Sequence, residues 1–120
     1  MLTLRLPGQP PMELHHLVLD FNGTLALRGI IADGVAERLH RLSTQLELHC
    51  VTGDTYGTAR NAIAGLPLQL HVLPPTGQSQ AKRDYAAQLS GGVCAVGNGW
   101  NDRPILAAAD LGLTVLMHEG

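Results

Sequence analysis

Aromatic residues are scarce in this 120-residue chain, where one Phe, one Trp and two Tyr make up 3% of the sequence. The chain therefore lacks the stacking surfaces on which single-stranded nucleic acids are usually bound. Its formal net charge of -2 at pH 7 provides no basic field to attract a nucleic-acid backbone or an acidic lipid surface. We therefore expect neither a nucleic-acid partner nor a membrane partner.

Long hydrophobic runs and cysteine are sparse as well. The chain has no stretch of about 18 consecutive apolar residues, the length that a membrane-spanning helix needs. Residues 1–11 lack the continuous apolar segment of a secretory signal peptide. Cys50 and Cys94 each lie in an apolar run, where a free thiol packs as a small hydrophobic side chain. We expect a cytoplasmic protein without a disulfide bond, because disulfides are rare in reducing compartments.

What the sequence does contain is the composition of an ordinary globular domain, with 45% hydrophobic and 15% charged residues. A chain of this length can bury one hydrophobic core without a disulfide or a structural metal. No internal repeat, low-complexity tract or linker interrupts the sequence. We therefore expect a single domain over residues 1–120.

Apolar runs alternate with segments of helical periodicity along most of the chain. Residues 2–6 and 13–20, separated by a Pro- and Gly-containing segment, predict a β-hairpin that leads into a buried strand. Further strands are expected over residues 46–51, 68–73, 93–96 and 111–116, and helices over residues 32–45, 55–66, 78–89 and 101–109. Asp33 is the expected N-cap of the first helix, and residues 25–31 are expected to form a loop. This alternation predicts an α/β fold built on a three-layer, doubly wound parallel sheet.

Four polar clusters follow the expected strands or begin the expected helices. Ligands of doubly wound sheets bind beyond the carboxyl ends of the strands, so we expect the four clusters to converge at that edge. The clusters are Asp20-Phe21-Asn22-Gly23-Thr24, Thr52-Gly53-Asp54, Lys82 and Gly97-Asn98-Gly99-Trp100-Asn101-Asp102. An Asp followed by Asn-Gly is by itself more typical of a turn. The order of all four clusters on the expected elements favours a functional site instead.

In this order the clusters resemble the motifs of the haloacid dehalogenase (HAD) superfamily, in particular those of soluble homologues of the P-type ATPase phosphorylation domain. The resemblance extends over residues 14–116. The matched positions are Asp20, Asn22, Gly23 and Thr24 in the first motif, Thr52 in the second, Lys82 in the third, and Gly97, Asn98, Gly99, Asn101 and Asp102 in the fourth. The resemblance implies a Rossmann-like HAD fold, and the short interval of residues 25–31 leaves no room for a cap domain.

The same resemblance implies a Mg²⁺-dependent phosphohydrolase that forms an aspartyl phosphate on Asp20. A carboxylate attacks a dianionic phosphate poorly unless a metal ion and a nearby cation, here Lys82, offset the repulsion. The implied catalytic residues are Asp20, Asn22, Thr52 and Lys82. The implied phosphate-binding residues are Asn22, Gly23, Thr52, Gly53 and Lys82. The implied Mg²⁺ ligands are Asp20, the main-chain carbonyl of Asn22, Asn98 and Asp102, which offer the hard oxygen atoms that Mg²⁺ prefers.

Two positions depart from the pattern of the superfamily. Phosphatases of this kind carry an acid-base Asp two residues after the nucleophile, whereas this chain has Asn22. An amide cannot exchange protons near neutral pH, and general acid-base catalysis is worth about 10² to 10⁴ in rate, so we expect slow turnover. Asn98 replaces a second Asp and removes one negative charge, so we expect weakened Mg²⁺ binding.

Without a cap, the site is open and suits a phosphorylated substrate that is macromolecular, or a small one shielded by a partner or by a second copy of the chain. Two alternatives to a phosphohydrolase stay open on the sequence: a non-catalytic regulatory module that binds Mg²⁺ and phosphate, and a soluble ATPase-like subunit of a larger assembly. The six histidines show no ligand spacing typical of a metal site. They are expected to be strand and surface residues, and no zinc site is expected.

Overall fold

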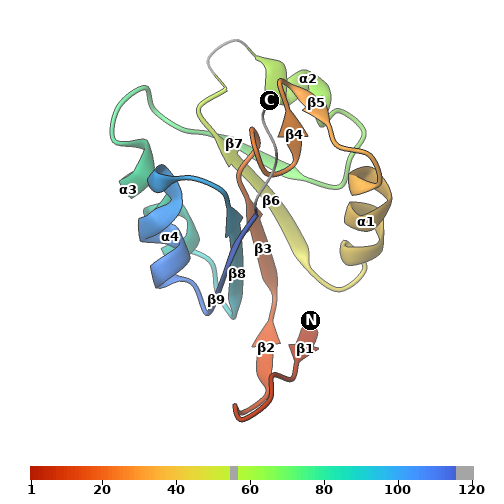
Figure 1. Ribbon diagram of the computed structural model, residues 1–120, viewed down its shortest axis with the longest axis vertical. Coiled ribbons are helices and arrows are strands. Elements are labelled where there is room, and N and C mark those ends of the chain that lie inside the picture. Colours follow the sequence, from red (N-terminus) through yellow and green to blue (C-terminus); the bar gives the residue numbers. More distant parts are fainter. Residues whose placement is uncertain (55–56, 116–120) are drawn as a thin grey trace.

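A computed structural model of the protein describes residues 1–54 and 57–115. At its centre lies a five-stranded parallel sheet in the order β7-β6-β3-β8-β9 (Figure 1). Its strands are β3 (His16–Leu19), β6 (Glu47–Thr52), β7 (Gln69–Val72), β8 (Val93–Gly97) and β9 (Leu111–Thr114). All four residues of β3 are buried, which explains why its sequence shows no polar alternation: a central parallel strand is covered on both faces.

Helices cover both faces of this sheet (Figure 1). They are α1 (Val35–Leu42), α2 (Thr58–Ala62), α3 (Gln78–Ala87) and α4 (Arg103–Ala108), the last preceded by a 3₁₀ turn, η1 (Trp100–Asp102). Leu17 and Leu19 of β3 belong to one apolar cluster with Leu39 of α1 and with Ile63, the residue that follows α2. Val18 of β3 points to the opposite face and belongs to a second cluster with Ala86 of α3 and Ile105 of α4. These two cores confirm the three-layer α/β architecture.

The strand order places the first parallel strand, β3, between the second, β6, and the fourth, β8. Successive crossovers therefore run in opposite directions from β3, and the carboxyl end of β3 lies at the switch point where doubly wound sheets bind ligands. The first residue after that end is Asp20. The topology thus directs the first polar cluster of the sequence to the ligand-binding edge.

Two short hairpins flank the sheet. The expected N-terminal hairpin is present as β1 (Leu2–Leu4) and β2 (Met12–Leu14), which pair in antiparallel fashion. The expected loop over residues 25–31 is wrong, because this segment forms a second antiparallel hairpin of β4 (Ala26–Leu27) and β5 (Ile30–Ile31). This hairpin is the only addition between β3 and α1, so no cap domain is inserted there.

The expected helix cap at Asp33 is also wrong. The N-cap of α1 is Gly34, which adopts a left-handed conformation with φ of 80° and makes no side-chain cap. Glycine occupies such a conformation without the steric cost that a side chain adds. Thr55 and Leu116, which the sequence places at the ends of a helix and a strand, lie outside the described residues. Within the described part of the chain, no helix is both long and apolar enough to cross a membrane.

Both cysteines are free and buried, as the sequence predicts. Burial raises the pKa of the Cys50 thiol to about 12, and the charges of Asp20 and Asp54 add to this effect. We expect Cys50 to resist alkylation by iodoacetamide at pH 9 in the folded protein and to react once guanidinium unfolds the chain. Because the folded state holds this proton more tightly than the unfolded state, we expect the free energy of unfolding to fall as pH rises above about 9. Rapid alkylation of Cys50 in the folded protein would contradict this burial.

Candidate active site

Asp20 is held at the carboxyl end of β3 by backbone hydrogen bonds. Its amide donates to the carbonyl of Val96 on β8 at 3.1 Å. The chain then turns around Phe21, whose side chain is only 1% exposed and whose carbonyl accepts the amide of Ala26 at 3.0 Å. Gly23 adopts a φ of 79° in this turn, and its amide donates to the carbonyl of Ala26 at 2.7 Å. The position of Asp20 is therefore fixed by both the sheet and the turn.

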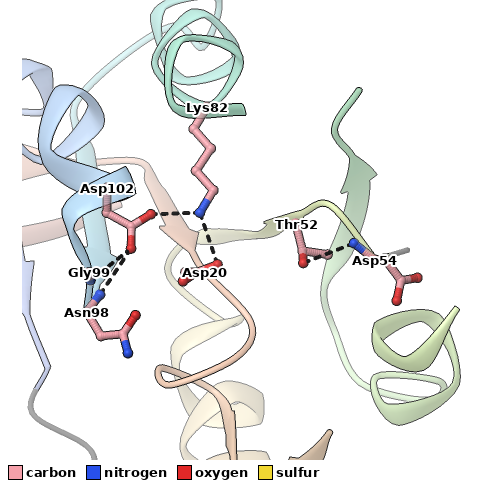
Figure 2. A network of polar contacts seen from close by, with 7 residues as sticks. All are labelled: Asp20, Thr52, Asp54, Lys82, Asn98, Gly99 and Asp102. Carbon is pink, nitrogen blue, oxygen red and sulfur yellow. Dashed lines mark hydrogen bonds and ion pairs between the residues drawn. The ribbon is translucent and has the colours of Figure 1, made fainter. Parts of the chain in front are cut away.

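Lys82 extends from α3 to two carboxylates that lie far apart in the sequence (Figure 2). Its ammonium donates to Asp20 Oδ1 at 3.0 Å and to Asp102 Oδ1 at 2.7 Å. Lys82 and Asp102 are buried, with exposed fractions of 8% and 2%. The structure thus brings these three predicted residues together in one place.

Asp102 is oriented by the loop that follows β8. Its Oδ2 accepts the amides of Asn98 at 3.1 Å and Gly99 at 3.4 Å (Figure 2). A Cβ atom at Gly97 would lie 2.5 Å from the Asp102 carboxylate, so any side chain there would displace it. Glycine at position 97 therefore lets Asp102 pack against the end of β8.

The charges of this cluster are unbalanced. Burial raises the pKa of Asp20; the positive charge of Lys82 opposes this shift and the negative charge of Asp102 adds to it. Burial alone lowers the pKa of Lys82, but the charge of Asp20 and the hydrogen bond to Asp102 outweigh burial, so its pKa is raised. Lys82 is therefore an ammonium ion at neutral pH. Two carboxylates share this single cation, which leaves a net negative charge in the cluster when both are ionised.

Thr52 and Asp54, both in the second polar cluster, have different roles. Thr52 is buried at the end of β6, and its hydroxyl accepts the amide of Asp54 at 3.4 Å (Figure 2). The carboxylate of Asp54 accepts the amides of Ala59 at 2.6 Å and Arg60 at 3.3 Å at the start of α2. Asp54 thus stabilises the beginning of a helix, whereas Thr52 lies at the site.

The polar clusters surround one cavity of about 380 Å³. The residues that line it are Asp20, Asn22, Thr52, Gly53, Gln78, Lys82, Asn98, Gly99, Trp100, Asn101 and Asp102. Of the predicted site residues, only Gly23 does not line the cavity; it is buried in the turn below. Gln78, the first residue of α3, also lines the cavity but is not among the residues that the sequence predicts there. Its position at the start of a helix that faces the ligand-binding edge is the signal that could have identified it.

The residues that line this cavity fit a magnesium ion. The carboxylates of Asp20 and Asp102 and the amide of Asn98 offer hard oxygen donors, which are the ligands that Mg²⁺ prefers. The single ammonium of Lys82 leaves negative charge uncompensated in a largely buried place. A divalent cation would neutralise that charge.

No family model matches the chain, but the chain is similar to a curated protein sequence and to several solved structures. Over 88 residues, 68% of this chain, it is 35% identical to an Alkalihalophilus pseudofirmus protein described as "Probable cadmium-transporting ATPase", and it spans 11% of that protein. The fold is similar to that of a HAD family hydrolase from Streptomyces avermitilis MA-4680, with a TM-score of 0.63 and 17% identity over 88% of this chain and 70% of that one. It is also similar to DsGPDH of Dunaliella salina, with a TM-score of 0.58 and 14% identity over 85% of this chain and 23% of that one.

Proposed function

The chain has the fold of the haloacid dehalogenase superfamily, and on that fold and the site geometry we propose that it is a Mg²⁺-dependent phosphohydrolase with Asp20 as its nucleophile. The observation that carries this proposal is the bridging of Asp20 and Asp102 by Lys82, at 3.0 and 2.7 Å. All three side chains face a cavity at the switch point of the sheet. A nucleophile, a cation and uncompensated negative charge in one cavity are the groups that phosphoryl transfer through a carboxylate needs.

In the first step, a carboxylate oxygen of Asp20 forms a bond to the phosphorus of the substrate, and the bond from phosphorus to the leaving oxygen breaks. The ammonium of Lys82 reduces the repulsion between the carboxylate and the phosphate oxygens. Asn22, Thr52 and Gly53 line the cavity, and in this proposal the Thr52 hydroxyl and the amides of Asn22 and Gly53 donate to those oxygens. Water then attacks the phosphorus of the aspartyl phosphate, which releases inorganic phosphate and restores the Asp20 carboxylate.

Asp20, Asn98 and Asp102, together with the main-chain carbonyl of Asn22, would hold Mg²⁺ in this proposal. When bound, Mg²⁺ supplies positive charge that polarises the phosphate and lowers its repulsion from the nucleophile. Because this chain has Asn98 where the superfamily motif has an Asp, its proposed Mg²⁺ ligands carry one negative charge fewer. We therefore expect activity to be half-maximal at a millimolar, not a micromolar, concentration of Mg²⁺.

Asn22 determines which substrates this site can use well. Its side chain is exposed and borders the cavity, but an amide cannot protonate a departing oxygen. Substrates whose leaving groups depart as stable anions, such as acyl and aryl phosphates, should therefore react faster than alkyl phosphates. The open cavity allows a macromolecular phosphate to reach Asp20.

The test is phosphate release from acetyl phosphate, p-nitrophenyl phosphate and an alkyl phosphate, with Mg²⁺ or with a chelator, for the wild type and Asn22→Asp. We expect slow, Mg²⁺-dependent release from the first two substrates by the wild type. Asn22→Asp should accelerate release from the alkyl phosphate by about 10²-fold, because it restores a general acid. The acceleration should be smaller for p-nitrophenyl phosphate, whose leaving group needs no proton.

Asn61→Asp is the matched control. Asn61 is exposed on α2 and lies outside the cavity, so this substitution should leave all rates unchanged. Equal release with Mg²⁺ and with chelator would contradict the metal dependence. If neither the wild type nor Asn22→Asp releases phosphate, and beryllium fluoride forms no adduct on Asp20, the chain is a binding module and not a phosphohydrolase.

A further inference from the structure

Two histidines and a glutamate, side chains of kinds that can bind a metal, lie together at the opposite end of the sheet, where β3 and β6 begin. His16 is the first residue of β3 and pairs in register with Glu47, the first residue of β6. His49 follows Glu47 by two residues, so the two side chains share one face of β6. His16 Nδ1 lies 3.1 Å from His49 Nε2 and 3.1 Å from Glu47 Oε2. All three ligand atoms lie within 4.8 Å of one another.

In each imidazole, one ring nitrogen faces the other two side chains and the second nitrogen makes a hydrogen bond elsewhere. That second hydrogen bond bears on whether the nitrogen that faces the cluster carries a hydrogen. His16 Nε2 lies 2.8 Å from the carbonyl of Ser90, which can only accept, so Nε2 carries the hydrogen and neutral His16 presents a lone pair on Nδ1. His49 Nδ1 lies 2.8 Å from the Tyr85 hydroxyl. With Nδ1 donating to that oxygen, His49 presents a lone pair on Nε2. In this tautomer the Glu47 carboxylate adds a third acceptor, and three acceptors at these distances repel one another unless a cation lies between them. In the other tautomer, the Tyr85 hydroxyl donates to His49 Nδ1 and His49 Nε2 donates to His16 Nδ1.

A metal ion satisfies the arrangement of three acceptors better than a proton on His16 does. One proton on His16 Nδ1 would be divided between two acceptors at 3.1 Å, whereas charge-assisted hydrogen bonds are typically about 2.7–2.9 Å long. In a tetrahedral zinc site with bonds of about 2.0–2.2 Å, ligand atoms lie about 3.4 Å apart, so these side chains need to move little. Histidine ligands also usually donate their second N–H to a carbonyl or another oxygen, as His16 and His49 can do here.

Burial opposes a positive charge on His49, and the cluster has a route to solvent. Burial lowers the pKa of His49, and His16 lowers it further, while the charge of Glu47 opposes the shift. A cavity of about 410 Å³ is lined by His16, Glu47 and Ser90 among others, and the Glu47 side chain is 62% exposed. An ion can therefore enter from solvent and keep an open coordination position toward the cavity.

We propose that His16, Glu47 and His49 form a second metal site, which binds a divalent transition-metal ion of the zinc class through two imidazoles and one carboxylate. Imidazole nitrogen suits zinc and its neighbours rather than Mg²⁺, so the site differs in chemistry from the cavity beside Asp20. The two sites are also separate in space. The four-residue rise from His16 to Asp20 along β3 places them about 13 Å apart.

The test is titration of the full chain with Co²⁺ in excess Mg²⁺, followed by visible absorption, and then displacement of Co²⁺ by Zn²⁺. A four-coordinate Co²⁺ site with imidazole ligands gives intense ligand-field bands, whereas a six-coordinate oxygen site gives weak ones. We expect one equivalent of intensely absorbing Co²⁺ in the wild type. Glu47→Gln should weaken binding by more than about 100-fold, and Tyr85→Phe, which removes an outer hydrogen bond, by about 10-fold to 100-fold.

His15→Gln is the matched control. His15 lines the same cavity but is not one of the three side chains whose ligand atoms lie together. This variant should bind Co²⁺ as the wild type does. Glu47 is mostly exposed, so Glu47→Gln should fold, and circular dichroism checks this. Zn²⁺ should also raise the Tm of the wild type but not of Glu47→Gln. The proposal is overturned if the wild type shows no intense Co²⁺ bands, or if folded Glu47→Gln binds Co²⁺ as tightly as the wild type.

Discussion

Asp20→Asn should reduce Mg²⁺-dependent phosphate release by at least about 10³-fold while leaving the protein folded. The amide keeps the shape of the side chain but is far too weak a nucleophile to attack phosphorus. The fold should tolerate the change, because Lys82 keeps its 2.7 Å hydrogen bond to Asp102 and one of two neighbouring negative charges is removed. The measurement is the initial rate of phosphate release from acetyl phosphate, together with the Tm.

Asp33→Asn is the matched control for this substitution. Asp33 is exposed and precedes α1, away from the cavity, so the same chemical change there should leave the rate unaltered. Beryllium fluoride should form an adduct with the wild type and Asp33→Asn but not with Asp20→Asn. Retention of the wild-type rate by Asp20→Asn would exclude Asp20 as the nucleophile.

Lys82→Met should abolish phosphate release and lower the free energy of unfolding by about 3–5 kcal/mol. The ammonium is buried between Asp20 and Asp102, so its removal leaves two neighbouring carboxylates without a counter-ion. Chemical denaturation monitored by circular dichroism measures the loss. Added Mg²⁺ should recover part of the stability, since a ligand that binds only the folded state stabilises it.

Arg83→Met is the matched control. Arg83 is the next residue on α3 and is exposed, so this substitution should change the free energy of unfolding by less than about 0.5 kcal/mol. The double variant Lys82→Met with Asp102→Asn should be more stable than Lys82→Met alone, because it leaves one fewer unpaired charge. If Lys82→Met proves as stable as the wild type, the ammonium is not the counter-ion of these carboxylates.

The sequence predicts the sheet well where periodicity and burial agree. The run over residues 16–19 lacks polar alternation, and it forms the central strand β3, which is buried on both faces. The β4–β5 hairpin was missed because two-residue strands are too short to show any period. The cap of α1 was misassigned because Asp33 and Gly34 are both common near helix starts, and only the backbone conformation decides between them.

The two clusters of titratable residues differ in how far sequence could reveal them. Asp20, Lys82 and Asp102 each follow a strand or belong to a helix at one edge, and the doubly wound topology is enough to predict their convergence. The meeting of His16 with His49 depends instead on the register of β3 against β6, in which His16 lies opposite Glu47. No local pattern encodes that register, so the histidines looked like unrelated strand residues.

The ion pairs of Lys82 close long segments of chain, since its partners lie 62 residues before it and 20 residues after it. The first pair joins the end of β3 to α3, and the second joins α3 to η1. Closure of such loops costs entropy before any contact repays it, so the cluster should assemble among the last events of folding. During refolding, phosphate release should therefore recover later than the helical circular dichroism signal, when the native structure is complete.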